Sequence, residues 1–100
     1  MPYSLKLYRG IEKQLERIPK KQRERLVAAM RSLSVEPRPP GCIKLDERLF
    51  RIRAGQYRII YAVFEDELVV FICKTARRTE STYRDLRKLL DRANRDVLEE

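Results

Sequence analysis

The chain has 100 residues, of which 43% are hydrophobic and 38% charged, so it can form one small domain and is too apolar for global disorder. Its net charge of +8 predicts attraction to phosphate polyanions or to an acidic protein. The absence of histidine and the spacing of Cys42 and Cys73 argue against a zinc site, and no apolar stretch is long enough to span a membrane. We therefore expect a cytoplasmic protein with reduced thiols, no cofactor and a single domain over residues 1–100.

The first third of the chain changes from a strand pattern to a helical one. Residues 2–8 place Tyr3, Leu5 and Leu7 at a period of two, which is typical of a half-buried strand. Apolar residues then recur at helical spacing over 9–18 and over 20–34, and Pro19 separates the two runs. The short connection predicts an antiparallel helical hairpin.

The middle of the chain indicates a loop followed by three consecutive strands. Residues 36–41 (EPRPPG) exclude regular structure, and residues 42–45 are long enough to pair only briefly. The strands are expected over Leu49–Ala54, Tyr57–Phe64 and 68–75, with a polar turn at 65–67. Gly55 tolerates a positive φ, which suits the first central position of a two-residue type II′ turn.

This turn sets a register that sorts the hairpin side chains by face. Ile52 falls opposite Ile59 on an apolar face, while Arg53 falls opposite Arg58 on the other face, one step from Arg51. Like charges directly opposite each other destabilise a sheet by roughly 0.2–1 kcal/mol. The cluster therefore favours a bound anion, and the alternative is a solvated face of long side chains.

The third strand is apolar on both faces, which is typical of a strand buried on both sides. Val69, Phe71 and Cys73 should share the arginine face, so that face has a basic end and an apolar end. Either the last helix or a partner must cover the apolar end.

A basic loop and an amphipathic helix complete the chain. Arg77 and Arg78 lie between strand and helix, where a loop can direct them towards the arginine face. Thr82 with Asp85 resembles a capping box, and Tyr83 begins an apolar stripe at spacings of three and four. Together the elements predict an α+β fold: an antiparallel-rich four-stranded sheet with an N-terminal helical hairpin and a C-terminal helix.

Three segments are distinctive: RAGQYRIIY across the hairpin turn, ELVVFICKTARR at the third strand, and Thr82-Tyr83 at the last helix. With these segments the chain resembles, over nearly its whole length, the RelE family of bacterial toxins within the RelE/ParE superfamily. The resemblance implies a type II toxin that acts as a ribosome-dependent endoribonuclease, cutting mRNA in the ribosomal A site and so inhibiting translation. It also implies a cognate antitoxin that wraps and blocks the toxin, with operator DNA reached only through that complex.

The resemblance also implies which side chains carry the cut. By motif they are Arg51 and Arg53 on the first strand of the hairpin, Arg58 just after the glycine turn, Arg77 or Arg78 in the loop, and Tyr83 at the start of the helix. Lys74 and Arg78 are expected to bind RNA. Family members often have lysine where this chain has Arg51 and Arg53, and arginine differs from lysine as a proton carrier.

Metal-independent RNA cleavage must remove a 2′-hydroxyl proton, stabilise the phosphorane and protonate the leaving 5′-oxygen. Without histidine, we expect catalysis that is mostly electrostatic and positional. Arg58 and Arg77 would grip the scissile phosphate, since the planar guanidinium suits phosphate. Arg51 and Arg53 would orient the backbone or stabilise the leaving group, and Tyr83 would stack on a base or assist proton transfer. Such a set should be slow on free RNA, which fits dependence on the ribosome for alignment.

Two other functions fit the same sequence. A ParE-like protein would have the same scaffold and inhibit DNA gyrase, and a non-catalytic basic module would bind ribosomal RNA without making a product. For the antitoxin, we expect an acidic amphipathic segment against the apolar end of the arginine face, near Val69 and Phe71.

Overall fold

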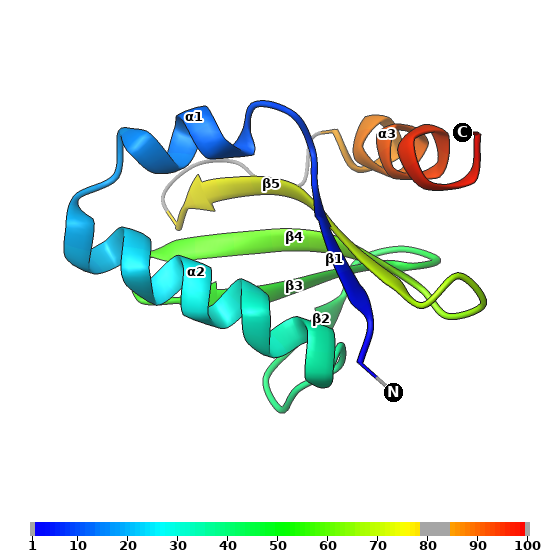
Figure 1. The fold of residues 1–100 in the computed structure, drawn as a ribbon, viewed down its shortest axis with the longest axis horizontal. Coiled ribbons are helices and arrows are strands. Elements are labelled where there is room, and N and C mark those ends of the chain that lie inside the picture. Colours follow the sequence, from blue (N-terminus) through cyan, green and yellow to red (C-terminus); the bar gives the residue numbers. More distant parts are fainter. Residues whose placement is uncertain (1, 79–84, 100) are drawn as a thin grey trace.

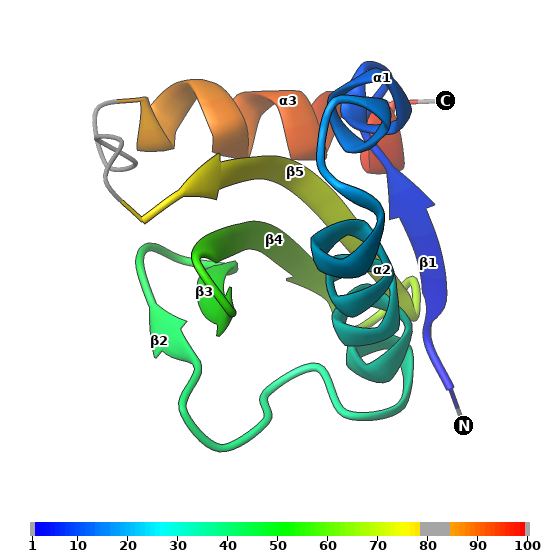
Figure 2. The ribbon, with the colours of Figure 1, turned by 90° about the vertical axis from the view of Figure 1, so that its left-hand side faces the viewer.

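A single sheet with helices on both faces forms the fold, in a computed structural model that describes residues 2–78 and 85–99. Helices α1 and α2 cover one face, and α3 covers the other (Figures 1 and 2). The elements in chain order are β1 (Ser4–Leu7), α1 (Ile11–Glu16), α2 (Lys20–Val35), β2 (Ile43–Lys44), β3 (Leu49–Ala54), β4 (Tyr57–Phe64), β5 (Val69–Arg77) and α3 (Leu86–Leu98). None of the helices in these described ranges is long and apolar enough to cross a bilayer.

The α+β class and the two sets of helices are confirmed, but the expected strand count was wrong. Five strands lie in the order β1-β5-β4-β3-β2, and the sheet is mixed because β1 runs parallel to β5. The additional strand is β2, which pairs with β3 through Ile43–Arg51 and Lys44–Phe50. Two residues are too short a run for hydrophobic alternation to identify as a strand.

The hairpin between β3 and β4 has the predicted register. Arg53 lies opposite Arg58, Ile52 opposite Ile59, and Ala54 and Tyr57 flank the turn. Gly55 has φ 64°, as a type II′ turn requires at this position. A side chain there would be strained by this φ and would also meet Arg25, whose Nη1 lies 2.8 Å from the position of an added Cβ.

A bulge interrupts the pairing of β4 with β5. Ile60 pairs with Lys74, but the next residue, Tyr61, pairs with Ile72, so Cys73 is an extra residue on β5. A bulge of one residue inverts the alternation of side chains beyond it. The side chains of the last four residues of β5 therefore lie on the face of the sheet opposite to the one expected for an unbroken strand.

Helices α1 and α2 bury the apolar face of the sheet. Both helices contribute fully buried apolar side chains, among them Ile11 from α1 and Leu26 and Leu33 from α2. Opposite them the sheet contributes Phe50, Ile59, Tyr61, Val63, Val70 and Ile72. This layer packs against the side of the β3–β4 hairpin opposite the arginines.

Helix α3 covers the apolar end of the arginine face. Leu89, Leu90 and Ala93 pack in one cluster with sheet residues that include Phe71, which is 1% exposed. The helix, rather than a partner, therefore fills the apolar end, and Phe71 is not free to receive the antitoxin segment expected there. The helix begins at Leu86 after Asp85, whose side chain makes no cap hydrogen bond, and the capping residue expected at position 82 lies outside the described residues.

Candidate nucleic-acid interface

Three arginines lie on the face of the sheet that carries α3, beyond the end that the helix covers. Arg53 and Arg58 are directly opposite on neighbouring strands, and Arg51 lies two residues earlier on β3, opposite Ile60. Neighbouring strands are about 4.8 Å apart, so the three side chains start from one small area. In the part of the chain that the structure describes, none of them forms an ion pair.

Burial makes Arg51 the most informative of the three. The residue is only 5% exposed, and its Nε and Nη1 atoms are buried with no hydrogen-bond partner among the described residues. Arg58 is half-buried and its Nε is also without a partner, whereas Arg53 is exposed. Burying an uncompensated charge costs several kcal/mol, so this arrangement calls for an anion that supplies the missing acceptors.

The bulge in β5 decides which basic residues of that strand join the arginines. Lys74 pairs with Ile60 and so shares the arginine face. Arg77 instead pairs with Tyr57 on the opposite face, where it lines a cavity of about 230 Å³ together with Arg17 and other residues. The structure thus places Lys74 beside the arginines, whereas Arg77 lies on the opposite face of the sheet, on the same side as α1.

The remaining two candidate residues lie after the strand. Arg78 is exposed, and its backbone N–H donates to the Gln56 carbonyl at 2.8 Å, which holds it beside the hairpin turn. Arg78 directly follows Arg77 in the chain and is the alternative to it at this site. Tyr83 lies outside the described residues, so its predicted role stays a prediction.

Sequence reasoning missed a second group of cations around Lys74. Arg9, Lys88 and Arg92 line one cavity with it, although they come from the start and the end of the chain. The i,i+4 spacing of Lys88 and Arg92 shows that they share a helix face. Nothing in the sequence indicates that this face meets Arg9.

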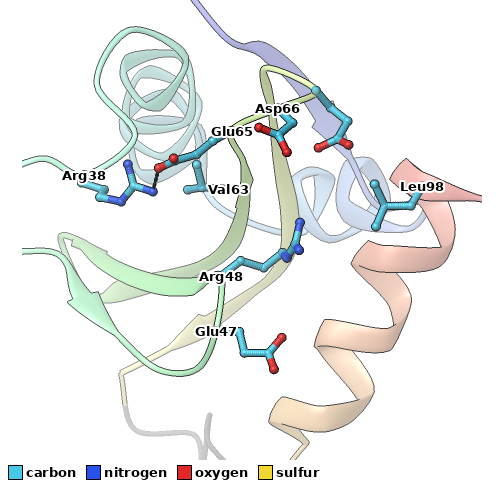
Figure 3. Close-up of a pocket in the computed structure, with 8 residues that line it drawn as sticks. Arg38, Glu47, Arg48, Val63, Glu65, Asp66 and Leu98 are labelled. Atoms are coloured by element: carbon cyan, nitrogen blue, oxygen red, sulfur yellow. Dashed lines mark hydrogen bonds and ion pairs between the residues drawn. The ribbon is translucent and has the colours of Figure 1, made fainter.

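The opposite end of the strands has a different character (Figure 3). A cavity of about 400 Å³ there is lined by residues that include Glu47, Asp66 and Glu67. Arg38 is paired with Glu65 at its rim, as the dashed line in Figure 3 marks, while the Arg48 guanidinium lies 4.4 Å from the Phe64 ring centroid. With so many carboxylates this end is unsuited to phosphate, and the arginine face is the better anion site.

The arrangement on the arginine face can hold and neutralise a phosphate, because guanidinium groups donate in a planar fork. No described group of three or more His, Cys, Asp or Glu residues could hold a metal ion.

Comparisons with known proteins decide the family. The sequence profile of the family described as "ParE toxin of type II toxin-antitoxin system, parDE" matches residues 5–82. In the crystal structure of an archaeal RelE–RelB complex from Pyrococcus horikoshii OT3, the matching chain is 32% identical. The match covers 81% of this chain and 100% of that one, with a TM-score of 0.74. The chain belongs to the RelE family, within the RelE/ParE superfamily.

Other RelE proteins share the fold at lower identity. A relative from Methanocaldococcus jannaschii that carries a RelE toxin name is 23% identical over 90 residues, which cover 85% of this chain and 99% of the relative. A mutant of the Escherichia coli toxin RelE in the free state is 20% identical. That match covers 97% of this chain and 99% of the E. coli chain, with a TM-score of 0.69. At this identity the E. coli structure speaks for the RelE fold alone.

Proposed function

We propose that this RelE-family toxin inhibits translation as a metal-independent endoribonuclease that cuts mRNA in the ribosomal A site. The single observation that carries the proposal is Arg51. Its Nε and Nη1 atoms are buried beside Arg53 and Arg58 with no hydrogen-bond partner among the described residues, as expected of a site that binds an anionic substrate.

In the proposed reaction, the arginine face binds the backbone on either side of the scissile phosphate. Arg58, half-buried and opposite Arg53, holds the phosphate as negative charge grows on its oxygens. Arg51 and Arg53 orient the backbone or stabilise the leaving 5′-oxygen, and Lys74 binds RNA from the neighbouring strand. One of Arg77 and Arg78 completes the grip, while Tyr83 stacks on a base or assists proton transfer.

Ribosome dependence follows from this set of groups. Arginine stays protonated and is a poor general base, and the chain has no histidine to replace it. The rate must therefore come mainly from charge stabilisation and from alignment of the 2′-hydroxyl for in-line attack. A ribosome that fixes the conformation of the mRNA would supply that alignment.

We also propose a cognate antitoxin as partner. The solved relatives include the Pyrococcus horikoshii RelE–RelB complex and the intact Escherichia coli RelBE toxin-antitoxin complex. A net charge of +8 favours an acidic antitoxin.

The test is primer extension on mRNA in programmed ribosomes, comparing wild type with Arg58→Ala and Arg58→Lys. Loss of a positioned donor to developing charge typically costs 10²–10³-fold in rate, so we expect a reduction of about that size for Arg58→Ala. Arg58→Lys keeps the charge but loses the planar fork and should fall between the two. Near-normal cleavage by Arg58→Ala would overturn the mechanism.

Three further variants belong in the same assay. Arg31→Ala removes an exposed charge from α2 on the other face of the sheet and should leave cleavage unchanged. Arg77→Ala and Arg78→Ala identify which of the two acts at the site. The residue whose substitution slows cleavage as much as Arg58→Ala is the one that acts at the site.

A second candidate function is inhibition of DNA gyrase, because the matching family profile is named for the ParE toxin. The basic residues at all the described motif positions favour the nuclease. A supercoiling assay with purified gyrase separates the two: inhibition of supercoiling without mRNA cleavage would establish the ParE-like function. A basic module without catalysis would bind ribosomes in a salt-sensitive manner and yield no cut product.

A further inference from the structure

We propose that a second anion subsite, where β1, α1, β5 and α3 meet, binds a backbone phosphate of the RNA next to the cut. The subsite is a cavity of about 310 Å³ whose lining includes Arg9, Lys74, Lys88 and Arg92. The inference rests on the proposed nuclease function and extends it, because it adds a binding position to the same RNA strand.

The charge of this cavity is strongly unbalanced. Of the described residues that line it, four are cations and Asp85 is the one carboxylate. Among residues 2–78 and 85–99, none of the four cations is in an ion pair. Lys88 and Arg92 also lie one helical turn apart, where like charges repel by roughly 0.2–0.5 kcal/mol. A bound anion would relieve this repulsion.

Arg92 is held in place for such a role. Its guanidinium carbon lies 3.7 Å from the centroid of the Tyr8 ring, and its Nη1 donates to the Cys73 carbonyl at 3.4 Å. Tyr8 is itself fixed by an edge-on contact with Phe71, with ring centroids 6.4 Å apart. These contacts immobilise the guanidinium plane while using one of its five N–H donors in a described hydrogen bond. A guanidinium fixed in this way binds phosphate with little further loss of entropy.

Lys74 makes the subsite continuous with the arginine face. It pairs with Ile60, and Ile60 pairs with Arg51 on the next strand. Two strand spacings separate the Cα atoms of Lys74 and Arg51 by roughly 10 Å. A strand of RNA that crosses the arginines is thereby led over Lys74 into the cavity, as in other positively charged grooves that follow a nucleic-acid backbone. This continuity favours an RNA phosphate over an isolated phosphate ion.

The test measures binding of a fluorescent hexanucleotide carrying 2′-O-methyl groups, which cannot be cut, at salt concentrations from 50 to 200 mM. The variant is Arg9→Ala/Lys88→Ala. The subsite adds one phosphate contact, which contributes about 0.7 to the salt slope for single strands, so we expect the slope to fall by about 0.7. At 100 mM salt the affinity should fall about fivefold.

The matched control is Arg31→Ala/Arg87→Ala, which removes the same charge. Arg31 is exposed on α2, and the Arg87 side chain is 83% exposed on α3, one residue before Lys88 and outside the cavity lining. Far-UV circular dichroism establishes that both double variants fold. The inference is wrong if both change the slope equally, or if the Arg9/Lys88 variant loses affinity for an acidic antitoxin peptide and not for RNA.

Arg58→Ala, measured beside them, separates this inference from the proposed function. Weaker binding by Arg58→Ala, with no specific effect of Arg9→Ala/Lys88→Ala, would remove the second subsite and leave the nuclease site in place. Undiminished binding and cleavage by Arg58→Ala would remove the proposed function instead.

Discussion

At the scale of single residues, burial sets the behaviour of Cys73 as it does that of Arg51. Cys73 is the extra residue of the β5 bulge and is 1% exposed beneath α3. Burial raises the pKa of its thiol to about 12, with Arg92 opposing the shift and Asp96 adding to it. The thiol is therefore neutral and unreactive in the folded protein, since the thiolate is the nucleophile.

This shift predicts a specific loss of stability at alkaline pH. Between the ordinary thiol pKa of about 9 and the folded value of about 12, the unfolded chain ionises at Cys73 and the folded chain does not. The folded state then binds more protons, so the contribution is complete below pH 9 and is lost as pH rises to 12. We expect the free energy of unfolding to fall by about 2 kcal/mol between pH 8 and 10.5 from this group alone.

Urea unfolding of wild type and Cys73→Ala at both pH values checks this prediction. The variant loses packing by an amount that does not depend on pH, and other alkaline groups affect both proteins equally. The difference in stability between the two proteins should therefore shrink by about 2 kcal/mol at pH 10.5. A constant difference would show that Cys73 is ionised without penalty in the folded state.

At the scale of secondary-structure elements, α3 covers the apolar end of the arginine face with a few buried side chains. Leu90 is 3% exposed in the cluster with the sheet, whereas Leu98 at the end of the same helix is 47% exposed. Leu90→Ala should lower the free energy of unfolding by about 2–5 kcal/mol, and Leu98→Ala by less than about 0.5 kcal/mol. Denaturant unfolding measures both, and equal losses would mean that α3 does not dock as described.

The elements also show what sequence patterns can predict. The β3–β4 register followed from the sequence because Gly55 selects the turn and a shift of one residue would place Arg51 and Arg53 in the core. The facing of Arg77 did not follow, because the bulge at Cys73 has no signal in an apolar run that is buried on both faces. The three arginines were thus predictable as a set, and the contribution of β5 was not.

The cavity beside Lys74 could not be predicted from any local sequence pattern. Arg9 and Arg92 are distant in sequence and meet only because β1 pairs in parallel with β5 beneath α3. Spacing identifies residues that share one element, whereas contacts between elements depend on the whole topology. The burial of Arg51 belongs to the same class, since nothing along β3 distinguishes it from the exposed Arg53.

At the scale of the whole molecule, charge is segregated along the strands. Acidic residues precede β3 and fill the β4–β5 turn: Asp46, Glu47, Glu65, Asp66 and Glu67. Basic residues occupy the other end of the strands, near the Gly55–Gln56 turn and the end of β5: Arg53, Arg58, Arg77 and Arg78. The two ends are on opposite sides of the view in Figure 1. The toxin should therefore approach RNA with its basic end first.

Association kinetics test whether this polarity, rather than the total charge, governs RNA capture. The eight residues of β4 separate the ends by about 26 Å, well beyond a Debye length of about 8 Å at physiological salt. Asp66→Asn/Glu67→Gln should therefore change the association rate with a hexanucleotide less than about twofold, although it raises the net charge by two. Arg53→Gln/Arg78→Gln lowers the net charge by the same amount and should slow association about fivefold or more. Stopped-flow fluorescence at 150 mM salt measures both rates. Changes of equal size and opposite sign would mean that net charge alone steers the encounter.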